Sequence, residues 1–382
     1  MRRDVFTADH ESFRMLVREF VAREVVPHHA AWEKAGRLPR EVFERLGDLG
    51  VLGMAIPEKH GGAGVGDFRY NVVLQEEAAR ALVTLGTVRT QLDVILPYFL
   101  AYADESQQER WFPGLASGRL LTAIAMTEPG TGSDLAGMRT SAVRDGDHYI
   151  LNGAKTFITG GLLADLVIVV ARTASDPEDR RAGLTLLVVE EGMPGFNRGR
   201  ALDKIGIKAQ DTAELSFDDV RVPVANRLGA EGAAFGYLGR NLPQERMTVA
   251  VGSVAQARAA LDATVEYVKE RKVFGAPVAS FQNTKFELAA VAVEVEAAQS
   301  MLDRAVIELV DGRLSGADAA KVKLFCTEVQ GRAVDRCLQL FGGYGYLLDY
   351  PIARLYADAR VARIYAGTSE VMKVIIAKSL GL

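Results

Sequence analysis

The spacing of apolar residues changes twice along the chain, and these changes constrain the fold more than any other feature. From residue 1 to about 120 the spacing is helical, as for Phe13, Val17 and Phe20, which share one helix face. Short β-branched runs and turn residues then follow to about residue 230, after which helical spacing returns. We predict an α+β protein: an N-terminal all-α domain (1–120), a middle β domain (121–230) and a C-terminal α-helical bundle domain (231–382).

Within these parts the pattern predicts individual elements. The N-terminal part includes a helical pattern over 88–102, and the β domain should be an antiparallel barrel or sandwich. A helix is expected to begin after Pro243, with Glu245 in its first turn. Residues 285–310 have few polar positions, so this helix is expected to be buried on several sides. The predicted strands are 120–126, 148–152, 166–171, 184–189 and 214–217, and the later helices are 247–272, 283–310, 316–341 and 352–364.

Composition excludes several classes of protein. The net charge is −4, and no basic stripe alternates with aromatic residues, so we expect no nucleic-acid partner. We also expect no membrane span, no signal peptide and no metal site, because no long apolar run and no metal-ligand spacing occurs. Cys326 and Cys337 would lie about 16 Å apart along one helix, too far for a disulfide. They are expected to be buried thiols in a reducing, cytoplasmic environment.

Residues 126–135, MTEPGTGSDL, follow a predicted strand and are rich in glycine and hydroxyl groups. Such a loop can bring backbone N–H groups close to a phosphate or to the polar edge of a ring. Composition alone slightly favours an ordinary surface loop.

Four further segments follow in order: NGAKTFIT (152–159), RKVFG (271–275), QLFGGYG (339–345) and IYAGTSE (364–370). Together with 126–135 they resemble the flavin-binding motifs of the acyl-CoA dehydrogenase family, and they span most of the chain. The resemblance implies that family's three-domain fold and FAD-dependent α,β-dehydrogenation of an acyl-CoA thioester to trans-2-enoyl-CoA. It also implies electron transfer to an electron-transfer flavoprotein and a homo-oligomer, expected to be a tetramer built as a dimer of dimers.

The resemblance also assigns cofactor contacts residue by residue. The family usually has Trp where Phe157 stands, but phenylalanine keeps a flat apolar face. Taken alone, Phe157 could equally be a core aromatic, and Arg271 a solvated charge at a helix end. The implied FAD contacts are Met126, Thr127, Gly132, Ser133, Phe157, Ile158, Thr159, Thr368 and Glu370, and, toward the FAD of a neighbouring subunit, Arg271, Phe274, Gln282, Gln339, Gly342 and Gly343.

The catalytic base is the one position where the sequence departs from the commonest family pattern. Most members carry a glutamate where this chain has Ala366, but a minority branch, which includes the long-chain and isovaleryl-CoA enzymes, carries the base on an earlier helix, before an arginine. The segment LPQERM (242–247) resembles that branch, so we expect Glu245 to be the base. Taken alone, Glu245 would read as an exposed acid in a first helical turn. The resemblance gives the Ala366 backbone N–H a bond to the thioester oxygen, and Ser133, Arg246 and Gly367 are expected near the substrate.

Two alternatives stay open. The same scaffold can serve a flavin oxidase or monooxygenase that acts on a non-CoA substrate, because fold does not fix function. A non-enzymatic partner subunit is the second alternative. The acyl group is not readable from the sequence, and its pocket is expected near Leu92 and Leu96.

Overall fold

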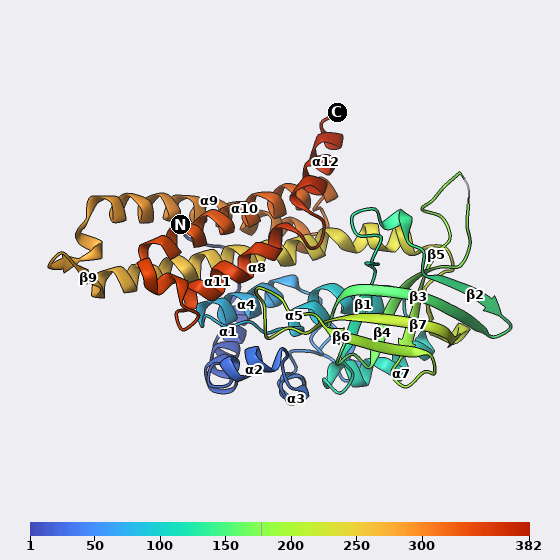
Figure 1. The fold of residues 1–382 in the computed structure, drawn as a ribbon. Coiled ribbons are helices and arrows are strands. Elements are labelled where there is room, and N and C mark those ends of the chain that lie inside the picture. The colour runs from blue at the N-terminus through green and yellow to red at the C-terminus, as the bar shows by residue number, and fades with distance from the viewer. Residues whose placement is uncertain (177) are drawn as a thin grey trace.

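The computed structural model describes residues 1–176 and 178–382. Helices, a β domain and a helical bundle follow one another along the chain (Figure 1), which confirms the predicted fold class. The N-terminal part interrupts its α-helices with two π-helical turns, η1 and η3. Its elements are α1 (Ala8–Phe20), η1 (Val21–Val25), α2 (His29–Ala35), α3 (Arg40–Asp48), η2 (Glu58–His60), α4 (Phe68–Arg80), α5 (Val88–Thr90), η3 (Gln91–Ile95), α6 (Leu96–Tyr102) and α7 (Glu105–Ala116).

The β domain is one eight-stranded sheet in the order β6-β7-β3-β2-β4-β5-β8, with β1 pairing β4 in parallel. All five predicted strands are present, but the sheet is not purely antiparallel. The sequence pattern missed β2, β6 and β8, which are short or largely exposed and so lack a continuous apolar run. The strands are β1 (Thr122–Ala125), β2 (Ser141–Asp145), β3 (His148–Thr159), β4 (Leu166–Arg172), β5 (Leu184–Glu190), β6 (Phe196–Ala201), β7 (Thr212–Pro223) and β8 (Arg227–Leu228).

The centre of this sheet is buried on both faces. On β4, Ile168 and Val170 pack into the core of the N-terminal helices, while Val167 and Val169 pack into a second core on the opposite face. A strand buried on both sides needs a continuous apolar run, which this segment has. The sheet is thereby fixed against the helices, and the loops at its edge are held in place beside them.

The C-terminal part is a bundle of long helices with a small hairpin at its far end (Figure 1). The predicted start of its first helix was wrong: α8 begins at Ala234, and Pro243 lies inside it. Loss of one N–H in a 37-residue helix is tolerated because packing, rather than propensity, holds so long a helix in place. The elements are α8 (Ala234–Glu270), β9 (Lys272–Val273), β10 (Ala276–Pro277), α9 (Gln282–Val310), α10 (Gly316–Leu340), α11 (Pro351–Ala359) and α12 (Ser369–Ser379).

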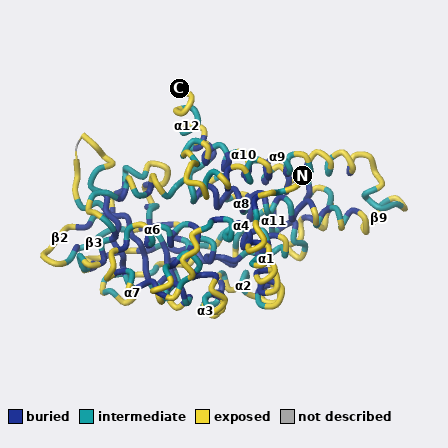
Figure 2. Tube along the Cα trace, turned by 180° about the vertical axis from the view of Figure 1, so that it is seen from behind, coloured by how far each residue is buried: buried dark blue, intermediate teal, exposed yellow. Residues whose placement is uncertain are grey.

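Helix α9 corrects a second expectation. In the single chain it buries one side only, through residues such as Val295 and Leu302. Its outer side is exposed toward the β9 hairpin (Figure 2), and Phe286 and Val293 there are 63% and 70% exposed. Both sides of the helix carry apolar residues, but the rest of this chain covers only the inner side.

Several smaller features bear on the other expectations. Cys326 and Cys337 are free, buried thiols on α10, and burial raises the pKa of these thiols to about 12 and about 11. In the described part of the chain no helix has the length and apolar character to cross a membrane. The same residues contain no group of three His, Cys, Asp or Glu side chains that could hold a metal ion.

Candidate active site

Glu245 lies in the interior of α8 and is 5% exposed, so it is not the exposed first-turn acid that its local sequence alone would suggest. The hydroxyl of Tyr98 on α6 donates a hydrogen bond to Glu245 Oε1 at 2.9 Å. Burial raises the pKa of Glu245 to about 7, against the opposing effects of Tyr98 and Arg246. A carboxylate with a pKa near neutrality is suited to accept a proton at physiological pH.

Two buried cations accompany this carboxylate. Arg246 follows it on α8 and donates weakly to the Gly316 carbonyl at 3.5 Å. Lys323 on α10 donates to the carbonyl of Gly367, and burial, followed by repulsion from Arg246, lowers the Lys323 pKa to about 8. With Glu245 ionised, the three groups leave one net positive charge, which favours an anion forming beside them.

The turn that Lys323 holds contains Ala366, the position that the family resemblance gives as the commoner place for the base. Ala366 has φ +52° and Gly367 has φ +92°, so both occupy the left-handed region. Among the residues that the structure describes, the N–H of Ala366 has no acceptor. The hydroxyl of Thr368 caps α12 by accepting from the Val371 N–H at 3.3 Å. The turn therefore leaves the Ala366 N–H available as a donor.

Glu370 is the rival carboxylate on this segment. It lies in the first turn of α12 and is exposed, whereas Glu245 is buried. Hydrogen bonds from its own N–H and from Thr368 lower the pKa of Glu370. An exposed carboxylate of low basicity is the poorer candidate for a general base.

A buried ion pair between Lys155 and Glu128 anchors the loop that follows β1. Lys155 on β3 donates to Glu128 Oε1 at 2.9 Å and to the Met126 carbonyl at 3.0 Å. The carboxylate of Glu128 accepts from the N–H groups of Arg139 and Thr140. Backbone pairing of Thr156 N–H with the Thr127 carbonyl at 2.9 Å joins the first two flavin motifs directly. The pair thus fixes both ends of the loop to the sheet.

Phe157 and the glycines of this loop are exposed near the ion pair. Phe157 has φ +60° and its side chain is 67% exposed, although its neighbours Thr156 and Ile158 are buried. A Cβ added to Gly130 or to Gly132 would meet nothing within 4 Å, so the loop is open on this side. An aromatic face held outward in a strained conformation, beside an open glycine loop, is compatible with the FAD that the motifs imply. The core alternative for Phe157 is contradicted by its exposure.

A second group of predicted cofactor residues lies elsewhere. Arg271 ends α8 beside the β9 hairpin, at the opposite end of the bundle from the β domain (Figure 1). Its guanidinium lies 5.0 Å from the ring centroid of Tyr344, over a groove also lined by Gly342 and Gly343. Phe274 has φ +49° and is 98% exposed. Within one chain these residues do not meet the loop at 126–133, and Gln282 and Gln339 belong to this distal group by sequence position.

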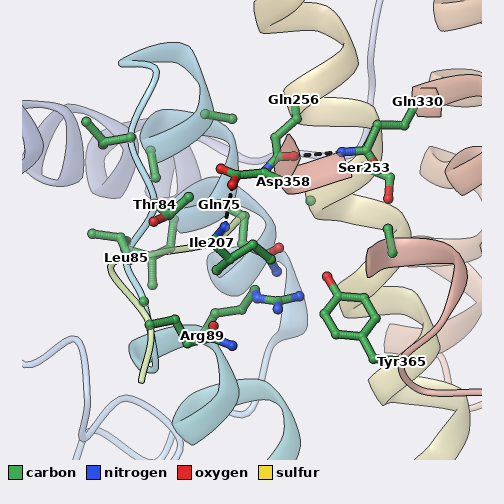
Figure 3. A pocket seen from close by; sticks show the side chains of 18 residues that line it. Gln75, Thr84, Leu85, Arg89, Ile207, Ser253, Gln256, Gln330, Asp358 and Tyr365 are labelled. Carbon is green, nitrogen blue, oxygen red and sulfur yellow. Dashed lines mark hydrogen bonds between the residues drawn. The ribbon is translucent and has the colours of Figure 1, made fainter. Parts of the chain in front are cut away.

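A cavity lined by both polar and apolar residues adjoins the turn at Tyr365, where the three parts of the chain meet (Figure 3). Arg89 faces the Tyr365 ring at 5.6 Å from its centroid. Gln210, which lines the cavity, donates to the Thr159 hydroxyl at 3.3 Å, so the cavity connects the second flavin motif with the last one. Its volume of about 70 Å³ suits a few water molecules rather than an acyl chain.

Leu92 and Leu96 are buried around a separate small void, and their place in the acyl pocket stays a prediction.

Sequence reasoning missed four of these residues. For Lys155 a signal existed, because it shares the inward face of β3 with Tyr149 and Leu151 at a spacing of two residues. Glu128 lies in the 126–135 loop, but nothing in the sequence around it indicates that it pairs with Lys155. Nothing in the sequence separates Tyr98 or Lys323 from other helical residues.

Comparison with known proteins identifies the class of enzyme. Family models match nearly the whole chain in order: acyl-CoA dehydrogenase N-terminal domain at 7–119, middle domain at 123–220 and C-terminal domain at 234–381. The chain therefore belongs to the acyl-CoA dehydrogenase family, and it is an oxidoreductase.

Individual relatives agree over nearly full length. The mitochondrial long-chain specific acyl-CoA dehydrogenase of Sus scrofa is 44% identical over 99% of this chain and 88% of its own. The acyl-CoA dehydrogenase structure from Geobacillus kaustophilus superposes with a TM-score of 0.97, at 43% identity and full coverage of both chains. A Mycobacterium smegmatis glutaryl-CoA dehydrogenase in complex with FADH2 has a TM-score of 0.89 at 30% identity, covering 98% of this chain and 95% of its own. A chain of a structure described as the electron-transferring flavoprotein of Acidaminococcus fermentans has a TM-score of 0.91 at 34% identity, with 98% of both chains covered.

Proposed function

We propose that this chain uses FAD to oxidise an acyl-CoA thioester between its α and β carbons, giving trans-2-enoyl-CoA. One observation carries the proposal: a buried carboxylate with a pKa of about 7 lies in a cluster with two buried cations, one of which holds the turn with the free Ala366 N–H. A weakly acidic α-CH needs both parts, a base of matched basicity and a donor to the carbonyl oxygen.

Glu245 is the proposed base and takes the α proton. The Ala366 N–H donates to the thioester oxygen, where negative charge grows as the proton leaves. Arg246 and Lys323 favour that charge through space, and Lys323 also keeps the 366–367 turn in its left-handed conformation by binding the Gly367 carbonyl. Burial of these groups excludes water, which strengthens each electrostatic interaction.

FAD, when bound, accepts the β hydride at its flavin N5. Phe157 would offer a flat face to the flavin, and the loop from Met126 to Ser133 would offer N–H and hydroxyl groups. The capped start of α12 at Thr368 would face the cofactor with free N–H groups. The relative bound to FADH2 supports this choice of cofactor.

We further propose that the distal group around Arg271 serves the FAD of a neighbouring subunit in a homotetramer. Its distance from the β domain and the uncovered apolar side of α9 support the proposal. The family resemblance and the similarity to the Acidaminococcus fermentans chain support an electron-transfer flavoprotein as electron acceptor.

The test is anaerobic bleaching of the bound flavin by a panel of straight, branched and aromatic acyl-CoAs. We expect at least one thioester to bleach the flavin completely and to yield the 2-enoyl product. A flavin that is bleached by no thioester, or an enzyme that forms peroxide rapidly from a non-CoA substrate in air, would contradict the proposal and favour a partner subunit or an oxidase.

A further inference from the structure

The π-helical turn η3 sets which of its own residues and which residues of the following helix, α6, face α8. In a regular α-helix, residues four apart share a face, but a π turn inserts one extra residue. Asp93 lies within η3 and Tyr98 lies five residues later on α6. Both side chains reach α8, where their partners Thr248 and Glu245 are three residues apart on one face. The extra residue of the π turn therefore brings Asp93 and Tyr98 into register with α8.

These contacts form two polar rungs between the helices. In the first, Tyr98 donates to Glu245 Oε1 at 2.9 Å. In the second, Asp93 Oδ2 accepts from Thr248 at 2.6 Å and from Gln75 on α4 at 2.9 Å. Gln244 adds a bond to the Asp93 carbonyl at 2.9 Å. The second rung anchors η3 to α4 and α8, so the first rung is held in a rigid frame.

Tyr98 is completely buried, so the packing around its ring restricts the position of its hydroxyl group. Among the described residues no other hydrogen bond reaches the Glu245 carboxylate, so only one of its two oxygens is tied down. The second oxygen is left to receive a proton. One donor on one oxygen also fixes the plane in which the other oxygen points.

We propose that Tyr98 is a positioning residue, which aims the free oxygen of Glu245 at the substrate α carbon and stabilises its ionised form. This inference rests on the proposed function, because it takes Glu245 as the base. The hydroxyl acts only through Glu245 and needs no contact with substrate.

Four titratable groups lie on or against the part of α8 that carries Glu245, and two of them shift its pKa. Tyr98 on α6 and Arg246 on α8 lower its pKa, whereas burial raises it. Asp93 on η3 is buried, and burial raises its own pKa to about 6. Lys323 on α10 adds positive charge behind Arg246. Of the four, Tyr98 alone donates a hydrogen bond to the carboxylate, so its removal isolates that contribution.

The experiment measures the rate of flavin reduction by acyl-CoA across pH in the FAD-loaded Tyr98→Phe enzyme. The rate rises with pH as the base ionises. Loss of the donor should move the midpoint upward by roughly one pH unit, because a hydrogen bond to a charged group is lost. The rate near pH 7 should fall about fivefold, and about tenfold at pH values below the wild-type midpoint, with KM and FAD content unchanged.

Tyr149→Phe is the matched control. Tyr149 is also fully buried and donates to a carboxylate, Glu231, at 2.7 Å, but it lies in the β domain. This control should lose similar stability and keep the wild-type pH profile. A profile of Tyr98→Phe that overlays the wild type would overturn the inference.

A second variant keeps the test decisive if Tyr98→Phe folds poorly. Replacement of Tyr98 with 3,5-difluorotyrosine keeps the size of the ring and makes the hydroxyl a stronger donor. The midpoint should then move to lower pH, and an unchanged midpoint would count against Tyr98. The two proposals fail differently: an active Glu245→Gln enzyme removes the proposed base, whereas an inactive Glu245→Gln with an unchanged Tyr98→Phe removes only this inference.

Discussion

Glu245 and Arg271 stand on the same helix, α8, and at 1.5 Å per residue roughly 39 Å of helix separates them. The proposed base and the arginine expected to bind a pyrophosphate therefore cannot contact one FAD within the same chain. On the proposed assembly, the Glu245 part of α8 and its Arg271 end each carry half of a site, and another subunit completes each half.

The first prediction concerns this assembly. Phe286→Glu places a charge on the uncovered apolar side of α9, which we expect to be a subunit contact. A buried, unpaired charge disfavours association strongly, so the variant should sediment as smaller species and lose FAD. Val143→Glu is the control, because Val143 is similarly exposed but lies on β2. A wild-type protein that sediments as a flavin-loaded monomer would contradict the proposal.

The second prediction concerns Arg271. Arg271→Ala should remain folded and bind FAD about 10- to 150-fold more weakly, the value of one charge-assisted phosphate contact. Fluorescence titration of the apo-protein with FAD measures the change. Lys269→Ala removes another exposed cation at the same helix end and should leave the affinity unchanged. Equal affinities for Arg271→Ala and wild type would make Arg271 a mere surface charge.

The third prediction concerns the base. Glu245→Gln should retain FAD and acyl-CoA but reduce its flavin at least about 100-fold more slowly. Adding Ala366→Glu should restore part of the rate, since that backbone position already holds an L-residue at φ +52°. Placement errors near 1 Å cost about 100-fold, so the recovery should be partial. Stopped-flow kinetics distinguish these outcomes, and a wild-type rate in Glu245→Gln would move attention to Glu370.

The fourth prediction concerns stability and pH. Between the ordinary Glu pKa and about 7, folded Glu245 keeps a proton that the unfolded chain has released, so its contribution to stability falls as pH rises through this window. Glu245→Gln removes this effect. The variant should match the wild type near pH 5 and exceed it by up to about 3 kcal/mol near pH 8. Denaturant unfolding at both pH values checks the sign, and an advantage that shrinks with rising pH would be inconsistent with it.

The fifth prediction concerns the ion pair beneath the flavin loop. Lys155→Met leaves the buried Glu128 carboxylate unpaired and should cost about 3–5 kcal/mol, with loss of FAD. The double variant Lys155→Met with Glu128→Gln should recover part of that loss. Breaking the exposed Lys269–Glu266 pair should cost less than about 1 kcal/mol. A mild effect of Lys155→Met on both unfolding and FAD content would show that the loop does not depend on the pair.

The fold was predictable because its signals are local. Apolar spacing identified the helical parts, and the β-branched runs identified five strands, including β4 with its doubly buried apolar run. The predicted start of α8 was wrong because the packing of this long helix overrides the local helix-start signal at Pro243. The expectation that α9 is buried on several sides was wrong for the single chain, because composition does not tell whether the same chain or another one covers a helix.

The candidate site was predictable only where a motif carries it. Glu245 was proposed as the base from its neighbours in sequence, but its burial and its partner Tyr98 depend on a π turn within a segment whose pattern predicted a regular helix over 88–102. No local rule places that extra residue. Lys323 and Gly367 are far apart in sequence, and only the packing of α10 against the last turn brings them together.

The division of function along α8 makes the two ends of this helix separately replaceable. An Arg271→Ala chain still carries its own Glu245, and a Glu245→Gln chain still carries an intact Arg271. In a mixed assembly the site built on the first chain receives its pyrophosphate contact from the second, so that one site in each mixed pair is complete. The two variants, one poor in FAD and one without its base when purified separately, should therefore complement each other at limiting FAD when they are unfolded together, mixed and refolded.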